Sequence, residues 1–214
     1  MTEKKTSLHE LKIDGVLCIS HEHRADRRER LVREFSDTGL NIEFYIVKAG
    51  GNASITDFES HKACAALALK RGYRSVVILE DNVSFEGVTP GQVRRINEFL
   101  KSDYPELFYL GATLGKLWLT WQPSIARCVG KSTHAYIINR AGCRKMLKFE
   151  YSDQGLHWLF TERFKAYCAF PMISQQQVAD FDTRDQYFEG PKNHKHQFSQ
   201  ARRNIFKTLL RRDL

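Results

Sequence analysis

The segment Ser75-Val-Val-Ile-Leu-Glu-Asp-Asn82 joins an apolar run to two acidic residues and an amide. A short apolar run with β-branched residues, bounded by polar residues, is typical of a buried strand in a parallel sheet. We therefore expect a strand at 75–79, with Glu80, Asp81 and Asn82 at its carboxyl end. In open α/β sheets, ligands bind outside the carboxyl ends of the strands. The segment thus indicates both a fold class and the place of a binding site.

Strand and helix patterns alternate on both sides of this segment. The predicted strands are 15–20, 42–47, 75–79, 107–110 and 135–138, and the predicted helices are 24–35, 56–70, 92–100, 141–147 and 156–167. Thr56 is the expected N-cap of the second helix, with Glu59 as its capping-box partner and Gly72 as the stop. This alternation predicts an α/β fold built on a parallel sheet.

The composition is that of a folded protein. Of the 214 residues, 42% are hydrophobic and 27% are charged, which excludes a disordered or collagen-like chain. The length fits one ordinary domain, which we place at residues 1–190. A basic tail over residues 191–214 follows it.

The tail carries most of the net charge of +8. Its apolar residues, among them Phe198, Ile205 and Leu209, recur at helical spacing, so we expect a basic amphipathic helix. Such a surface suits a polyanionic neighbour: acidic lipid head groups, a phosphorylated glycan or nucleic acid. The alternative is a solvated C-terminal helix.

The cysteines and the first residues indicate a compartment. The five cysteines are widely spaced and form no CxxC pair, so neither a disulfide framework nor a zinc site is indicated. The first residues are polar, and no stretch approaches the roughly 20 apolar residues that span a bilayer. We expect a cytoplasmic protein that contacts the inner membrane face peripherally through its tail.

The polar residues after the 75–79 strand suit a hard divalent cation, because such ions bind oxygen ligands and retain waters. Asp81 and Asn82 are the predicted metal ligands. A cation held there would bridge two phosphates of a nucleotide diphosphate and stabilise the charge on that leaving group, as sugar transfer requires. An acidic pair after an apolar strand is also common as an ordinary loop entry or helix N-cap.

Several segments, in order, resemble glycosyltransferase family 25, which includes lipopolysaccharide-biosynthesis and collagen galactosyltransferases. The matching segments are Val16-Leu-Cys-Ile-Ser20, Arg24-Ala-Asp-Arg-Arg28, Ser60-His61, Val77-Ile-Leu-Glu-Asp81, His134-Ala-Tyr-Ile-Ile138 and Asp153. The resemblance implies a GT-A type fold, a Rossmann-like sandwich with a mostly parallel central sheet. It also implies a UDP-sugar donor, Mn²⁺ or Mg²⁺, and inversion at the anomeric carbon. It does not extend to the tail.

Glu80 and Asp81 match the first two positions of the family's Glu-Asp-Asp motif, and Asn82 departs from the third. A neutral carbonyl binds a cation less strongly than a carboxylate. Either other groups and the diphosphate hold the metal, or metal dependence is weakened. The resemblance and the predicted fold place further donor-binding residues at Ser20, Arg24, Arg27, Arg28, His61 and Gln177.

A guanidinium fork suits phosphate recognition, and Arg27 is the preferred contact. The alternatives are a solvated helix start for the arginines and a structural role for His61. An inverting transfer needs a general base, and Asp153 matches the family's later acidic position. Asp153 or Ser152 is equally suited to cap the helix that follows.

The sequence leaves the acceptor open. The resemblance favours a lipopolysaccharide or other surface glycan, whereas the basic tail would serve DNA with hydroxylated bases equally well. Asn82 raises a rival, a catalytically impaired descendant that binds a nucleotide or glycan. A nucleotidyltransferase is a third alternative, but it normally needs a Gly-rich phosphate loop at the first strand, and this sequence has none there.

Overall fold

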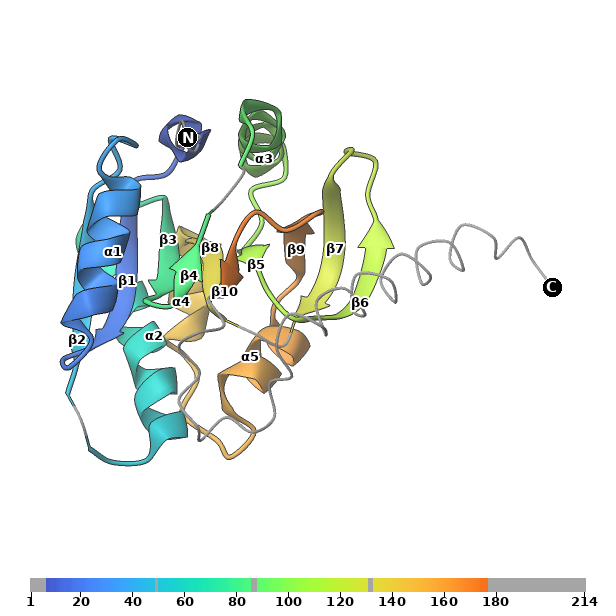
Figure 1. Ribbon diagram of the computed structural model, residues 1–214. Coiled ribbons are helices and arrows are strands. Elements are labelled where there is room, and N and C mark those ends of the chain that lie inside the picture. The colour runs from blue at the N-terminus through green and yellow to red at the C-terminus, as the bar shows by residue number, and fades with distance from the viewer. Residues whose placement is uncertain (1–6, 49, 86–87, 131–132, 177–214) are drawn as a thin grey trace.

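The computed structural model describes residues 7–48, 50–85, 88–130 and 133–176. Figure 1 shows a central sheet with helices packed on both of its faces. The tail over residues 191–214 lies outside the described residues, as does the predicted donor contact Gln177.

An eight-stranded sheet in the order β2-β1-β3-β8-β5-β9-β7-β6 forms the centre. Its strands are β1 (Gly15–His21), β2 (Ile42–Val47), β3 (Ser75–Glu80), β5 (Leu107–Gly111), β6 (Leu114–Leu119), β7 (Ile125–Gly130), β8 (Ala135–Asn139) and β9 (Ala166–Ala169). β1 pairs in parallel with β2 and β3, and β5 pairs in parallel with β9. In this sheet, β8 and β7 run against the other strands. The predicted α/β class with a mostly parallel central sheet is confirmed.

Helices cover both faces of this sheet. The 3-10 helix η1 (Ser7–Glu10), α1 (Ala25–Phe35) and α3 (Pro90–Ser102) supply one hydrophobic cluster. The other face is covered by α2 (Ala53–Lys70), α4 (Arg140–Met146) and α5 (Gly155–Arg163). A small antiparallel pair, β4 (Val83–Ser84) with β10 (Gln175–Gln176), lies outside the main sheet.

Alternate residues of β3 face these two layers. Val77 and Leu79 pack in the cluster that contains α1 and α3. Val76 and Ile78 pack in the cluster that contains α2, α4 and α5. A strand buried on both faces needs apolar residues at every position, which explains the uninterrupted run that ends at Glu80.

The start of the second helix differs from the prediction. The N-cap is Asn52, whose side chain accepts hydrogen bonds from the backbone N–H groups of Ser54 and Ile55, so the Thr56 cap is wrong. Asparagine is among the strongest N-caps, and it adds one turn to the helix. Gly72 follows the helix with a φ of 74°, the left-handed conformation expected of a helix stop.

The stretch at 156–167 is only in part the helix that its pattern predicts. α5 ends at Arg163, and residues 166–169 form β9 between β5 and β7. Pairing with two neighbouring strands overrides the local helical pattern there. Strands β6 and β7 were not predicted, because the charged side chains of Lys116 and Arg127 interrupt any apolar run in them.

Within the described ranges, no helix combines the length and the apolar character that crossing a bilayer requires.

Candidate functional site

The acidic strand end lies between two backbone pairings. The Glu80 N–H donates to the carbonyl of His134 at 2.9 Å, which extends the pairing of β3 with β8 by one residue. Further along the chain, Val83 begins β4, and its partner there is Gln176 of β10. The turn that carries Asp81 is therefore fixed at both ends.

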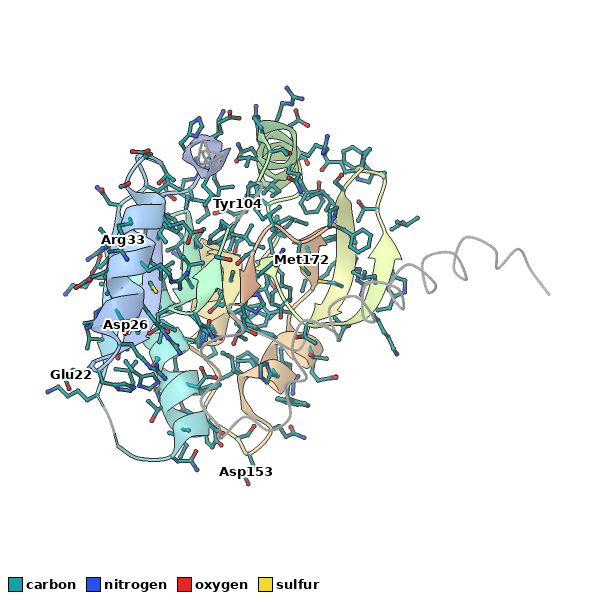
Figure 2. All side chains as sticks on the ribbon, viewed as in Figure 1. Glu22, Asp26, Arg33, Tyr104, Asp153 and Met172 are labelled. Carbon is teal, nitrogen blue, oxygen red and sulfur yellow. The ribbon has the colours of Figure 1, made fainter. Side chains whose placement is uncertain are left out.

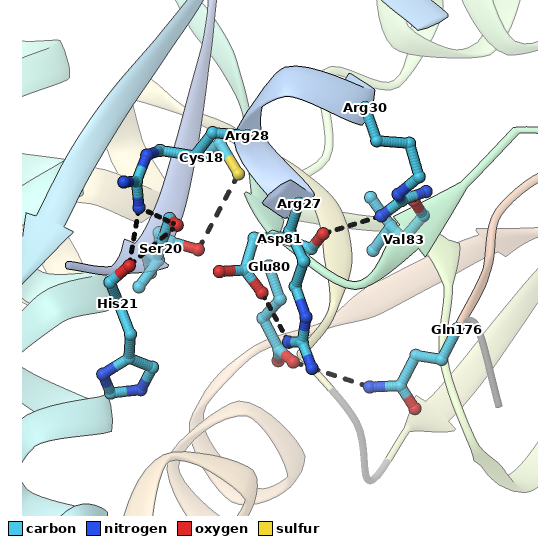
Figure 3. Close-up of polar contacts among 11 residues, drawn as sticks. Cys18, Ser20, His21, Arg27, Arg28, Arg30, Glu80, Asp81, Val83 and Gln176 are labelled. Carbon is cyan, nitrogen blue, oxygen red and sulfur yellow. Dashed lines mark hydrogen bonds and ion pairs between the residues drawn. The ribbon is translucent and has the colours of Figure 1, made fainter. Parts of the chain in front are cut away.

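Asp81 forms a buried ion pair with Arg27 of α1 (Figure 3). Arg27 Nη1 lies 2.8 Å from Asp81 Oδ1, and the two side chains are only 9% and 7% exposed. Arg27 was predicted as a donor contact, and the fold places it directly on the predicted metal ligand. A carboxylate and a guanidinium at this distance neutralise one another and hold each other in place.

Two oxygens of the turn remain without a hydrogen bond from the described residues. They are Asp81 Oδ2 and Asn82 Oδ1, and both are buried. Mg²⁺ and Mn²⁺ are bound through one or two protein oxygens together with waters and substrate phosphates, so these two atoms fit such an ion. Across the described ranges, no three His, Cys, Asp or Glu side chains come together as a metal site. The described part of the turn thus offers one carboxylate oxygen and one amide oxygen as candidate ligands.

Glu80 has a different environment from Asp81. Its Oε1 accepts a hydrogen bond from Thr133 Oγ1 at 3.1 Å, and its Oε2 accepts one from Gln176 Nε2 at 3.5 Å. Burial, reinforced by the negative charge of Asp57, raises the pKa of Glu80 from 4.5 to about 7. The two adjacent carboxylates thus have different partners: Asp81 contacts a guanidinium, whereas Glu80 accepts hydrogen bonds from a hydroxyl and an amide.

Arg28 and Ser20 meet at the end of β1. The Arg28 guanidinium donates to Ser20 Oγ at 3.0 Å and to the carbonyl of His21 at 2.6 Å (Figure 3). It also donates to the carbonyl of Glu22 at 3.0 Å. Arg24 is half-buried at the N-cap position of α1. The helix starts one residue later than predicted, and all three predicted arginines lie in or beside its first turn.

His61 of α2 is fully buried between the buried Tyr136 and the partly exposed Asp57. Its Nδ1 is 2.8 Å from the Tyr136 hydroxyl, and its Nε2 is 3.5 Å from Asp57 Oδ1. Burial by itself would raise the pKa of Asp57, but the hydrogen bond and charge of His61 outweigh it and hold that pKa below its ordinary value. These contacts fix His61 in the core beside Glu80. The charge of Asp57 raises the pKa of Glu80, and that of His61 lowers it.

Asp153 lies apart from this cluster. Figure 2 shows its side chain at the lower end of the molecule, pointing away from the body, and the residue is exposed. The predicted cap is wrong, because Gln154 occupies the N-cap position of α5 and no side chain caps that helix.

Several residues that contact the turn were not predicted from the sequence. They are Arg30, Glu34, Thr133 and Gln176, together with Asp57 next to His61. Only Gln176 carried a local signal, as the neighbour of the predicted Gln177. The others come from distant parts of the chain, and no spacing pattern links them to residues 80–82.

No protein-family model matches the chain, and no curated protein matches it either. Among solved structures, it is similar to a glycosyltransferase involved in the glycosylation of the major capsid of PBCV-1, at 11% identity and a TM-score of 0.49, over 89% of this chain and 100% of that one. It is also similar to HddC from Yersinia pseudotuberculosis, at 12% identity and a TM-score of 0.42, over 86% and 77%. A mannose-1-phosphate geranyltransferase from Thermus thermophilus matches at 9% identity and a TM-score of 0.40, over 72% and 73%. At this level the likenesses assign no activity to this chain.

Proposed function

We propose that the chain is an inverting glycosyltransferase that moves a hexose from a UDP-sugar to a hydroxyl of a polyanionic acceptor. The observation that carries the proposal is the buried Arg27–Asp81 pair at the carboxyl end of β3, with the two unbonded oxygens beside it. Open α/β sheets bind ligands at this edge. The resemblance of the surrounding segments to glycosyltransferase family 25 supports the choice of donor.

The turn and α1 would bind the donor's diphosphate. Asp81 Oδ2 and Asn82 Oδ1 would hold a Mn²⁺ or Mg²⁺ ion, which supplies positive charge where the diphosphate leaves. Arg27 keeps Asp81 oriented and adds a guanidinium beside the phosphates, while Arg24 and Arg28 lie at the adjacent start of α1. Thr133 and Gln176 hold Glu80 beside this turn through their hydrogen bonds.

Inversion needs a base on the acceptor side. Asp153 is the base that the family resemblance proposes. Its carboxylate points away from the Asp81 turn in this structure, so the role requires the segment before α5 to bring it within hydrogen-bond reach of the attacking hydroxyl. The preferred acceptor is a lipopolysaccharide or another surface glycan, with the basic tail resting on anionic lipid. DNA with hydroxylated bases is the competing acceptor. A steep loss of acceptor affinity with salt for duplex DNA, absent for glycan, would decide for DNA.

A second candidate is a binding protein that no longer turns over its donor. Asn82 replaces a carboxylate with a neutral amide, and Arg27 neutralises Asp81. Both features lower the attraction of the turn for a cation. Donor binding without cleavage by the folded protein would favour this candidate.

The test is a donor-hydrolysis screen over UDP- and GDP-sugars, with and without Mn²⁺. We expect one UDP-sugar to be cleaved, and Asp81→Ala to slow cleavage by about 100-fold or more, as removal of a leaving-group stabiliser does in other enzymes. Asp26→Ala removes an exposed acid of α1 and should leave the rate unchanged. The proposal would be falsified if the folded wild type neither bound nor cleaved any donor.

A further inference from the structure

Arg30, which no motif singled out, bonds twice to the backbone of the turn after β3 (Figure 3). Its Nη2 donates to the carbonyl of Asp81 and its Nη1 donates to the carbonyl of Val83, both at 2.8 Å. These two carbonyls flank Asn82. One planar guanidinium therefore spans the residue that carries one of the two unbonded oxygens.

Glu34 continues the same contact one helical turn further along α1. Its Oε1 accepts a hydrogen bond from the backbone N–H of Phe85 at 2.6 Å. Its Oε2 lies 3.7 Å from Arg30 Nη1, so it also holds the guanidinium that bonds the turn. Both side chains are about one fifth exposed, at 23% for Arg30 and 21% for Glu34.

Arg27, Arg30 and Glu34 lie on one face of α1, because residues three and seven positions apart project in similar directions from a helix. Together they contact the side chain of Asp81 and backbone groups from 81 to 85. A single helix face thus fixes both the acidic side chain and the backbone that aims it.

We propose that Arg30 and Glu34 are positioning residues for the turn. They fix the backbone that directs Asp81 Oδ2 and Asn82 Oδ1, and they do not touch the donor themselves. This inference rests on the proposed function, since it assumes that those oxygens serve a metal-bound diphosphate. A guanidinium suits the task because its rigid fork fixes two acceptors at once, which the single ammonium of lysine does not.

The first test compares Arg30→Lys with Arg33→Lys, a matched change at an exposed residue of α1 that Figure 2 shows at the surface. UDP binding is measured by calorimetry over a range of Mn²⁺ concentrations. We expect the Mn²⁺ concentration for half-maximal UDP binding to rise about tenfold or more in Arg30→Lys, because displacement of positioned groups by about 1 Å is costly. Arg33→Lys should match the wild type. Partial unfolding would reduce the number of sites without shifting this concentration.

The second test compares Glu34→Ala with Glu34→Gln. The glutamine keeps an oxygen that accepts the Phe85 N–H, whereas alanine removes it. We expect Glu34→Ala to shift the Mn²⁺ dependence in the same direction as Arg30→Lys, and Glu34→Gln to recover most of the wild-type value. Hydrogen exchange at the Phe85 amide should be faster in the alanine variant.

The outcomes separate the two proposals. Wild-type UDP binding and Mn²⁺ dependence in both Arg30→Lys and Glu34→Ala would overturn the positioning role and leave the proposed function standing. A folded wild type that binds no UDP at any Mn²⁺ concentration would overturn the proposed function, and the positioning role with it.

Discussion

Arg27 Nη1 lies 2.8 Å from Asp81 Oδ1 in a pair that is almost fully buried. Breaking a buried pair by removing one partner costs more than the pair itself contributes, because the remaining charge stays out of water without compensation. The pair therefore links the conformation of the strand end to the stability of the fold.

Arg27→Met should lower the free energy of unfolding by about 3–5 kcal/mol, because Asp81 would remain buried and unpaired. The double variant Arg27→Met/Asp81→Asn should regain part of that loss, since it leaves no charge behind. Urea unfolding followed by circular dichroism measures both, with the exposed Arg33→Met as control. Equal losses in Arg27→Met and Arg33→Met would contradict the assignment of a buried ion pair.

Asn82→Asp should strengthen metal binding, because a carboxylate attracts a cation more than an amide oxygen does. We expect the Mn²⁺ concentration for half-maximal UDP binding to fall about tenfold, equivalent to ~1.4 kcal/mol. Ser36→Asp adds the same charge at the C-terminal end of α1 and should leave the Mn²⁺ dependence of UDP binding unchanged. If donor turnover also rises strongly, the native turn is partly disabled, whereas an unchanged Mn²⁺ dependence would remove Asn82 from the metal site.

The sheet and its strand end could be predicted because burial on both faces leaves a plain signal. The 75–79 run is apolar after its first residue and then turns polar at Glu80. Strand β6 was not predicted, because Lys116 interrupts its apolar run. Residues 166–169 were predicted as helix, because their composition also suits one. Their strand state comes from neighbours in the sheet, and a local pattern does not contain those neighbours.

The sequence predicted that the acidic residues lie at the end of a strand, but it did not predict their contacts. Arg27 was expected on a phosphate, and the fold pairs it with Asp81. Arg30 and Thr133 were not anticipated, since each lies 53 positions from a group that it bonds. Contacts of that kind depend on how the layers pack, which one sequence does not reveal.

Asp57 should make the stability depend on acid pH through its contact with His61. The contact holds the pKa of Asp57 below the value of 3.8 that it has in the unfolded chain, even though burial opposes this. Its contribution is therefore present above pH 3.8 and is lost as the pH falls through the lower, folded value. Asp57→Asn should flatten this part of the urea-unfolding profile. Glu59→Gln, an exposed change on α2, should keep the wild-type slope, and parallel profiles for Asp57→Asn and the wild type would refute the contact.

A side chain at Gly111 should destabilise the fold. The register between β5 and β8 shifts at this residue, which leaves little room beside it. A Cβ at this position would meet His134 Nε2 and, at 2.6 Å, the backbone oxygen of Ser174. Gly111→Ala should lower the free energy of unfolding by about 1–3 kcal/mol through overpacking. Gly91→Ala is the control, since its Cβ would come no closer than 3.7 Å to Arg95. An unchanged free energy of unfolding in Gly111→Ala would show that His134 and Ser174 do not pack tightly against this position.

The thiols should be unreactive in the native protein, since all five cysteines are buried and free. Burial raises the pKa of Cys64 and of Cys143 to about 12. For Cys18, burial and then the charge of Asp81 raise the pKa of the thiol. The thiolate is the reactive form, so Ellman's reagent at about pH 8 should label the folded protein slowly and all five thiols promptly in denaturant.

Because Cys18 lies beneath the site, Arg27→Met should speed its labelling more than that of Cys143 if loss of the ion pair loosens this end of the sheet. An equal increase in the labelling rate at both thiols would show that the variant does not loosen this end of the sheet selectively.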